Sequence, residues 1–166
     1  MHAGHREAAI ATAIDAIRHG ARREVAAVAG ADLDEGLART VREWVLESLL
    51  QGAWMREYHE WEKATKAFFD GNHARNGGGK VDWRGKVPGV PRASHVDRVR
   101  AQLALFGAAV PEDALAAIDR AREGVNLAKH EAEHFIGEAD YRAFVRAIER
   151  FWEALAEQEE FTPPAR

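Results

Sequence analysis

Apolar residues recur at every third or fourth position along most of this chain, which is the spacing of an amphipathic α-helix. The segment from Tyr141 to Leu155 shows the pattern most clearly. Its apolar face consists of Tyr141, Phe144, Val145, Ile148, Trp152 and Leu155, with Phe151 beside them. The same spacing runs from Ile10 to Val28, and no segment alternates as a half-buried strand would. The pattern predicts an all-α fold, a helical bundle of about five helices in a single domain over residues 1–166.

The longest predicted helix covers approximately residues 34–70 and is apolar on more than one side. One stripe consists of Leu37, Val41, Trp44, Val45 and Met55. Ser48 and Gly52 lie in the middle of this stripe and would allow a neighbouring helix to approach closely. The other apolar residues are Leu46, Leu49, Leu50, Trp54, Tyr58, Trp61, Phe68 and Phe69. Such a helix is typical of the centre of a bundle or of an interface with a partner chain. We predict one core that includes Ile14, Val41, Val45, Ile148, Trp152 and Leu155.

Residues 71–93 interrupt the helical pattern with a dense series of glycines and prolines, which predicts one long irregular loop. Long loops inside compact domains are usually functional or disordered. Ser94 and Asp97 then have the spacing of a capping box, which predicts a short helix that runs through Phe106. Pro111 favours the start of a fourth helix, since proline is tolerated in the first turn.

The composition is that of a folded globular protein, with 46% hydrophobic and 30% charged residues. The formal net charge of −4 argues against a general binder of polyanions, although it leaves room for a local basic patch. The chain has no cysteine, which excludes disulfides, thiol catalysis and thiolate metal sites. No apolar run is long enough for a membrane span, so we expect a cytoplasmic protein without membrane contact. The tail, residues 161–166, contains two prolines and is not expected to be helical.

The predicted loop carries most of the candidate ligand-binding residues. Between residues 71 and 94 there are five cations and a single acid, Asp82, so the local charge is +4. The candidates are Arg75, Lys80, Trp83, Arg84 and Lys86. An aromatic residue among cations suits single-stranded nucleic acid or a phosphorylated ligand. We expect the segment from Arg75 to Arg92 to be mobile and to contact an acidic partner or nucleic acid. The alternative is a solvated loop whose Trp83 packs back onto the bundle.

Histidines raise a different class of function, metal binding. Residues 130–134 have the H-E-x-x-H spacing of zinc proteases, but such enzymes place that helix beneath a strand, and the sequence predicts none. The segment also contains the Glu-x-x-His spacing of di-iron bundles, without a second such pair on a core-facing stripe. Together with His59, the pair His130 and His134 resembles the ligands of small DinB-related four-helix bundles, which bind a divalent metal such as zinc. Helical phase argues against that site, because it predicts that His59 faces the interior, whereas His130 and His134 share a polar stripe with Asn126.

The stripe of Asn126, His130 and His134 also carries a second resemblance. A late helix with such a stripe, in a small bundle with an aromatic second helix, resembles the HEPN-type helical domains of toxin–antitoxin and phage-defence systems. Active members of that family are RNases that use an Arg-x-x-x-x-His pair. In this chain no arginine stands five residues before a histidine, and Arg122 precedes His130 by about two helical turns. The resemblance therefore implies a non-catalytic member and assigns no catalytic residue.

These observations together predict a non-enzymatic helical-bundle interaction protein that needs no cofactor. We expect it to bind a protein partner or to self-associate, with nucleic acid as a further partner of the loop. The alternative is a metal-binding bundle or metal-dependent enzyme that uses His59, His130 and His134.

Overall fold

The computed structural model describes residues 11–14, 35–130 and 137–158, and within these ranges it leaves undescribed the side chains of 35–38, 42, 125 and 128–130. The described chain is all-α, as predicted. Its labelled helices are α2 (Glu35–Arg75), α3 (His95–Phe106), α4 (Glu112–His130) and α5 (Glu138–Ala156), and residues 11–14 are also helical. The described ranges contain no strand, only an isolated bridge between Val87 and Val90. Most of the predicted first helix and the tail, 161–166, lie outside the described residues.

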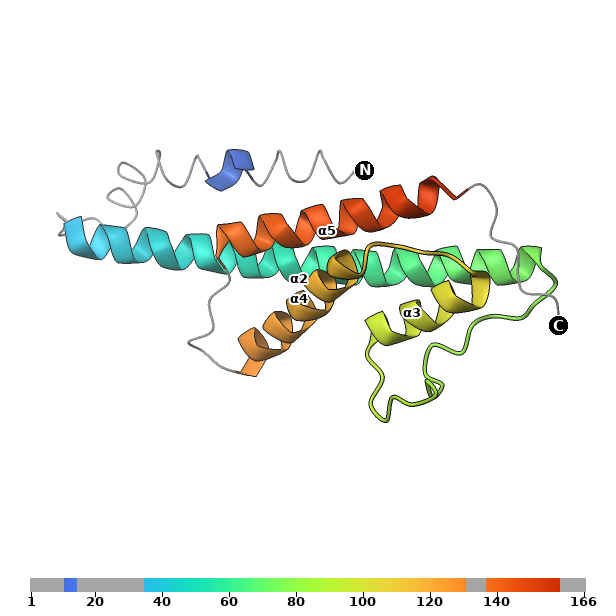
Figure 1. Ribbon diagram of the computed structural model, residues 1–166. Coiled ribbons are helices and arrows are strands. Elements are labelled where there is room, and N and C mark those ends of the chain that lie inside the picture. Colours follow the sequence, from blue (N-terminus) through green and yellow to red (C-terminus); the bar gives the residue numbers. More distant parts are fainter. Residues whose placement is uncertain (1–10, 15–34, 131–136, 159–166) are drawn as a thin grey trace.

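The long helix α2 is the axis of the bundle (Figure 1). At 41 residues it is about 60 Å long, whereas α4 and α5, with 19 residues each, reach only about 28 Å. α4 packs against α5 and α2, and α3 packs against α2 and α4. Figure 1 shows that the N-terminal part of α2 projects beyond the ends of α4 and α5. None of the helices that the structure describes is long and apolar enough to cross a membrane.

The predicted apolar face of α5 is the part of the core that the sequence indicated best. Its buried residues are Tyr141, Phe144, Val145, Ala147, Ile148, Phe151 and Leu155. Trp152 is only partly buried, and its ring lies edge-on to those of Phe68 and Phe151. Ile14, from the N-terminal helical segment, is also buried in the core. The predicted apolar face of α5 is therefore confirmed as part of the core.

The core-facing side of α2 differs from our prediction. Its buried apolar residues are Leu50, Trp54, Tyr58, Trp61 and Phe69. The N-terminal part of the predicted stripe is uncovered: Trp44 is 65% exposed and Val45 37%, while Val41 is half-buried. Met55, farther along the stripe, is partly buried against the core. The large aromatic residues of the other face bury more apolar area and therefore decide the orientation of the helix. The apolar face does not continue toward the N-terminus in the same positions, because Glu43 and Glu47 stand seven residues before Leu50 and Trp54.

The end of α2 also differs from the prediction, because the helix continues to Arg75 and the irregular connection begins only at residue 76. Phe69 and Asn72 are buried, so this last part of the helix packs against the bundle. The Asn72 side chain donates a hydrogen bond to the carbonyl of Phe68, 2.9 Å away. These interactions outweigh the cost of Gly71 in the helix.

The predicted ends of α3 are confirmed. The hydroxyl of Ser94 accepts a hydrogen bond from the backbone N–H of Asp97, and the Asp97 carboxylate accepts one from the backbone N–H of Ser94. Gly107 ends the helix in the left-handed conformation, with φ of 65°, which a residue without Cβ adopts easily. The reciprocal hydrogen bonds at Ser94 fix the point where the long connection enters α3.

Candidate functional site

The basic loop comprises residues 75–92, that is, the last residue of α2 and most of the irregular connection that follows it. Its cations are exposed and have no ion-pair partner among the described residues. This holds for Arg75, Lys80, Arg84, Lys86 and Arg92. Arg75 donates only to the neutral side chain of Asn72. The single acid of the loop, Asp82, accepts a hydrogen bond from the backbone N–H of Arg84. The positive charge of the loop is therefore displayed to solvent without neutralisation by a neighbouring carboxylate.

Asp70 on α2 anchors the middle of this connection. Its Oδ1 accepts a hydrogen bond from the backbone N–H of Val81, at 3.0 Å, and another from the indole N–H of Trp83, at 3.1 Å. Val81 and Trp83 are both partly buried and pack against the core. One carboxylate oxygen therefore fixes the backbone and the only aromatic side chain of the loop at the same point.

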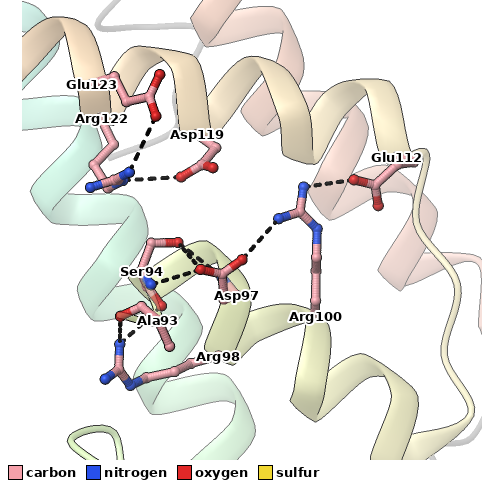
Figure 2. Close-up of polar contacts among 9 residues, drawn as sticks. All are labelled: Ala93, Ser94, Asp97, Arg98, Arg100, Glu112, Asp119, Arg122 and Glu123. Atoms are coloured by element: carbon pink, nitrogen blue, oxygen red, sulfur yellow. Dashed lines mark hydrogen bonds and ion pairs between the residues drawn. The ribbon is translucent and has the colours of Figure 1, made fainter. Parts of the chain in front are cut away.

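A second anchor is Arg98 on α3 (Figure 2). Its guanidinium donates hydrogen bonds to the carbonyls of Ala93 and Ser94, which precede the helix. It also reaches the carbonyl of Gly85, at 3.4 Å. The loop is therefore held near its middle and at its end by side chains of two different helices.

Trp83 is placed as in the alternative that we considered, packed back onto the bundle. Its ring centroid lies 5.1 Å from that of His95 and 6.2 Å from that of Phe69. The indole N–H is taken by Asp70. The cations of the loop are thus presented without their aromatic neighbour.

His95 is a buried polar residue that the sequence analysis missed. Its Nε2 lies 2.7 Å from the hydroxyl of Thr65, which is fully buried on α2, and its ring is edge-on to that of Trp61. Burial lowers the pKa of His95 from 6.5 to about 4, so the imidazole is neutral at physiological pH. One signal could have revealed it: His95, Val99, Leu103 and Phe106 are spaced as one helical face, and all are buried.

Glu62 on α2 lies beside His95 and is partly exposed. Its carboxylate is 2.7 Å from Nζ of Lys66, 3.7 Å from Nδ1 of His59 and 3.9 Å from Nδ1 of His95. Partial burial alone would raise the pKa of Glu62, but the hydrogen bond from Lys66 and the nearby His95 and Lys66 lower it overall. Burial, reinforced by Glu62, raises the pKa of Tyr58. Glu62 is therefore an ionised carboxylate between two imidazoles, already neutralised by an ammonium group.

The cations on the helices mostly have structural partners. In Figure 2, Arg100 joins Asp97 of its own helix to Glu112 at the start of α4, with nitrogen–oxygen distances of 3.2 and 2.6 Å. Arg122 pairs in the same way with Asp119 and Glu123 on α4. Such partly exposed pairs contribute little stability each, but they occupy the guanidinium groups. The loop cations differ from these in having no ion-pair partner among the described residues.

The histidine triad is not brought together in the described part of the chain. We predicted that His59 faces the interior, and this was wrong, because its side chain is 52% exposed. The reason is the different orientation of α2. The backbone of His130 ends α4, but its side chain is not described, and His134 lies outside the described residues. Asn126 is exposed, as expected. Among the described residues no group of three or more histidine, cysteine or carboxylate side chains could hold a metal ion.

The projecting part of α2 presents a second exposed surface. No residue between 39 and 49 whose side chain is described is buried. Trp44 and Val45 are the exposed large hydrophobic residues here. Ser48 and Gly52 are also exposed, and a Cβ added at Gly52 would meet no atom within 4 Å. We call Trp44, Val45, Ser48 and Gly52 the α2 surface.

Comparison with known proteins gives no further guidance, since no family model, no curated protein and no solved structure matches this chain.

Proposed function

We propose that this chain is a non-enzymatic helical-bundle interaction protein that binds an anionic partner through its basic loop, residues 75–92. One observation carries the proposal: the five cations of this loop are exposed without an ion-pair partner in the described part of the chain. The rest of the chain carries the opposite net charge, since the loop contributes +4 and the whole chain is −4. Recognition of an anion is therefore local to this loop.

The placement of the other polar groups supports a binding role. His95 is neutral, buried and hydrogen-bonded to Thr65, and Glu62 is already paired with Lys66. Arg100 and Arg122 link acids within and between helices. These groups stabilise the bundle through their contacts, whereas the loop cations are free to contact a ligand.

The test compares the parent with a variant in which Arg75, Lys80, Arg84 and Lys86 are replaced by Ser. Binding to single-stranded RNA, DNA and an acidic polypeptide is measured at low and near-physiological salt. A matched control replaces four exposed arginines outside the loop, Arg39, Arg56, Arg120 and Arg146, by Ser and changes the net charge equally. Loss of binding in the loop variant alone supports the proposal. If the parent binds no polyanion at low salt, or if both variants bind as the parent does, the proposal is wrong.

A second candidate function is self-association through the α2 surface. Trp44 is favoured as its centre because it is 65% exposed next to Val45, which is 37% exposed, and adjoining exposed apolar residues mark interaction sites. Ser48 and Gly52 leave room for a second helix to approach. Arg39, Glu43 and Glu47 give this part of α2 both signs of charge, which suits pairing with an identical helix. The occupant that we propose is therefore a second copy of this chain.

The resemblance to HEPN-type domains remains a proposal about biological setting. It is supported by the all-α architecture and by Asn126, which is exposed on α4. In a toxin–antitoxin or phage-defence setting, a basic loop would serve to contact RNA or DNA. Expression of the chain in cells, with growth and RNA integrity followed, would separate a non-catalytic member from an active RNase.

A further inference from the structure

We infer that the basic loop binds the phosphate backbone of nucleic acid without stacking on bases, so that duplexes bind at least as well as single strands. This inference rests on the proposed function, because it names the partner class of the same loop. It departs from the expectation that the sequence raises for an aromatic residue among cations, which is binding to single strands.

The position of Trp83 does not favour stacking on bases. Proteins that bind single strands use exposed aromatic rings on which bases stack. The Trp83 ring instead lies against His95 and Phe69, and its N–H donates to Asp70. It is also the only aromatic residue between 76 and 94. The loop therefore offers a base no fully exposed ring on which to stack.

The absence of exposed large hydrophobic residues from the described loop favours nucleic acid over an acidic protein as its partner. Protein interfaces depend on a few apolar or aromatic anchors that become buried at their centre. The exposed large hydrophobic residues of the described chain are Trp44, Val45, Leu105 and Leu127, and none of them belongs to the loop. Phosphate recognition requires no such anchor, because cations and counterion release supply the affinity. Charge without apolar surface is thus better suited to a phosphate backbone.

The cations of the loop extend from a backbone that is held at two points. Asp70 holds Val81, next to Lys80, and Arg98 holds Gly85, between Arg84 and Lys86. Anchoring reduces the ordering cost of binding, since less of the loop must be immobilised when a ligand arrives. The arginines can also contact phosphate oxygens through two N–H groups at once.

The magnitude of the salt effect follows from the number of cations. Each phosphate contact on a duplex adds about 0.9 to the slope of log affinity against log salt. If four or five cations make contact, the affinity should fall about 150- to 500-fold between roughly 50 and 200 mM salt. Removal of four cations should abolish most of this dependence.

The experiment measures fluorescence anisotropy of a labelled short DNA duplex, of each of its single strands and of polyglutamate, at the two salt concentrations. The proteins are the parent, the Arg75/Lys80/Arg84/Lys86→Ser variant and Trp83→Leu, all checked for unchanged helicity by circular dichroism. We expect the duplex to bind at least as tightly as either strand, Trp83→Leu to bind within about twofold of the parent, and the quadruple variant to lose the salt-dependent binding.

The contrary outcomes are distinct. A preference of tenfold or more for a single strand, abolished by a change at Trp83, would overturn the inference and establish stacking. Binding of polyglutamate but of no nucleic acid would also overturn it, while the proposed function would stand with an acidic protein as partner. If no polyanion binds the parent, both the inference and the proposed function are wrong.

Discussion

Nε2 of His95 lies 2.7 Å from the hydroxyl oxygen of Thr65, and this contact joins the first residue of α3 to the C-terminal part of α2. The Thr65 hydroxyl is also 2.9 Å from the carbonyl of Trp61 and 3.0 Å from that of Glu62. It has one hydrogen, so when it donates to a carbonyl of its own helix, His95 donates to it through Nε2–H. In that arrangement Nε2 carries a hydrogen, and Nδ1 lies 3.9 Å from the Glu62 carboxylate.

This arrangement predicts that stability depends on pH in a window set by His95. Its pKa is lowered by burial from 6.5 to about 4, so below pH 6.5 the unfolded state binds a proton that the folded state does not. The free energy of unfolding should therefore decrease as the pH falls from 6.5 to 4, by about 1.4 kcal/mol per pH unit at most. The lowered pKa of Glu62 acts in the same direction, but only below its ordinary value of 4.5.

Urea denaturation of the parent and of His95→Gln across this pH range tests the prediction. The variant should lose most of the pH dependence between 6.5 and 4, although it is less stable at neutral pH. Equal slopes for the parent and His95→Gln would show that another group titrates.

The neighbours Phe151 and Trp152 provide a test of the core. Phe151 is fully buried, whereas Trp152 is only partly buried against Phe68. Phe151→Ala should lower the free energy of unfolding by about 3–5 kcal/mol, and Trp152→Ala by clearly less, although tryptophan is the larger residue. Thermal and urea unfolding would measure both. A larger loss for Trp152→Ala would contradict the packing of α5.

The Asp70 anchor predicts a local change in the loop. Asp70→Ala removes the acceptor for the N–H groups of Val81 and Trp83, so the amide of Val81 should exchange its hydrogen faster. Asp70→Asn is the control, because its amide oxygen can still accept both hydrogen bonds. Hydrogen exchange followed by mass spectrometry would measure the effect. If the amide of Val81 exchanges freely in the parent, the loop is mobile, as the sequence first led us to expect.

Self-association can be tested with an engineered cysteine, because the chain has none of its own. If the α2 surfaces of two copies meet, Ser48→Cys should form a disulfide-linked dimer on mild oxidation. Ala64→Cys, exposed elsewhere on α2, should form much less, and Trp44→Ser should weaken the dimer in sedimentation. A monomer at every concentration would refute self-association through the α2 surface.

Metal content remains a prediction that needs a direct measurement. We expect the protein, purified without a metal-chelating tag, to carry less than one zinc, iron, manganese or nickel ion per chain. We based this expectation partly on an interior position of His59, but His59 is exposed. Elemental analysis of the parent decides the question. One tightly held ion, lost when His59, His130 or His134 is replaced, would favour the metal-binding alternative.

The sequence predicted those parts of the fold that depend on local spacing. The capping box at Ser94, the end of α3 at Gly107 and the apolar face of α5 follow from short-range hydrogen bonds and from a single helical period. Each requires no knowledge of a distant element. Their prediction was therefore confirmed within a residue or two.

The sequence could not determine which face of α2 is buried. Trp44 and Trp54 both belong to plausible apolar stripes, and only the positions of α4 and α5 decide that Trp54 is covered. The error then carried over to His59, which was placed by its phase relative to Val41 and Met55. For the candidate site, the sequence was sufficient to predict the positive charge of the loop. The inward turn of Trp83 depends on Asp70, eleven and thirteen residues from the groups that it binds.

The two anchors of the loop also bear on how this chain can change in evolution. Asp70 and Arg98 divide the connection between α2 and α3 into separate short spans, each closed by its own hydrogen bonds. Residues inserted or deleted around Gly77 and Gly79 would lengthen or shorten only the first span. The cations beyond Val81 would keep their positions. Homologous chains could therefore differ in the length of this glycine-rich stretch and still present the same charges at the same sites.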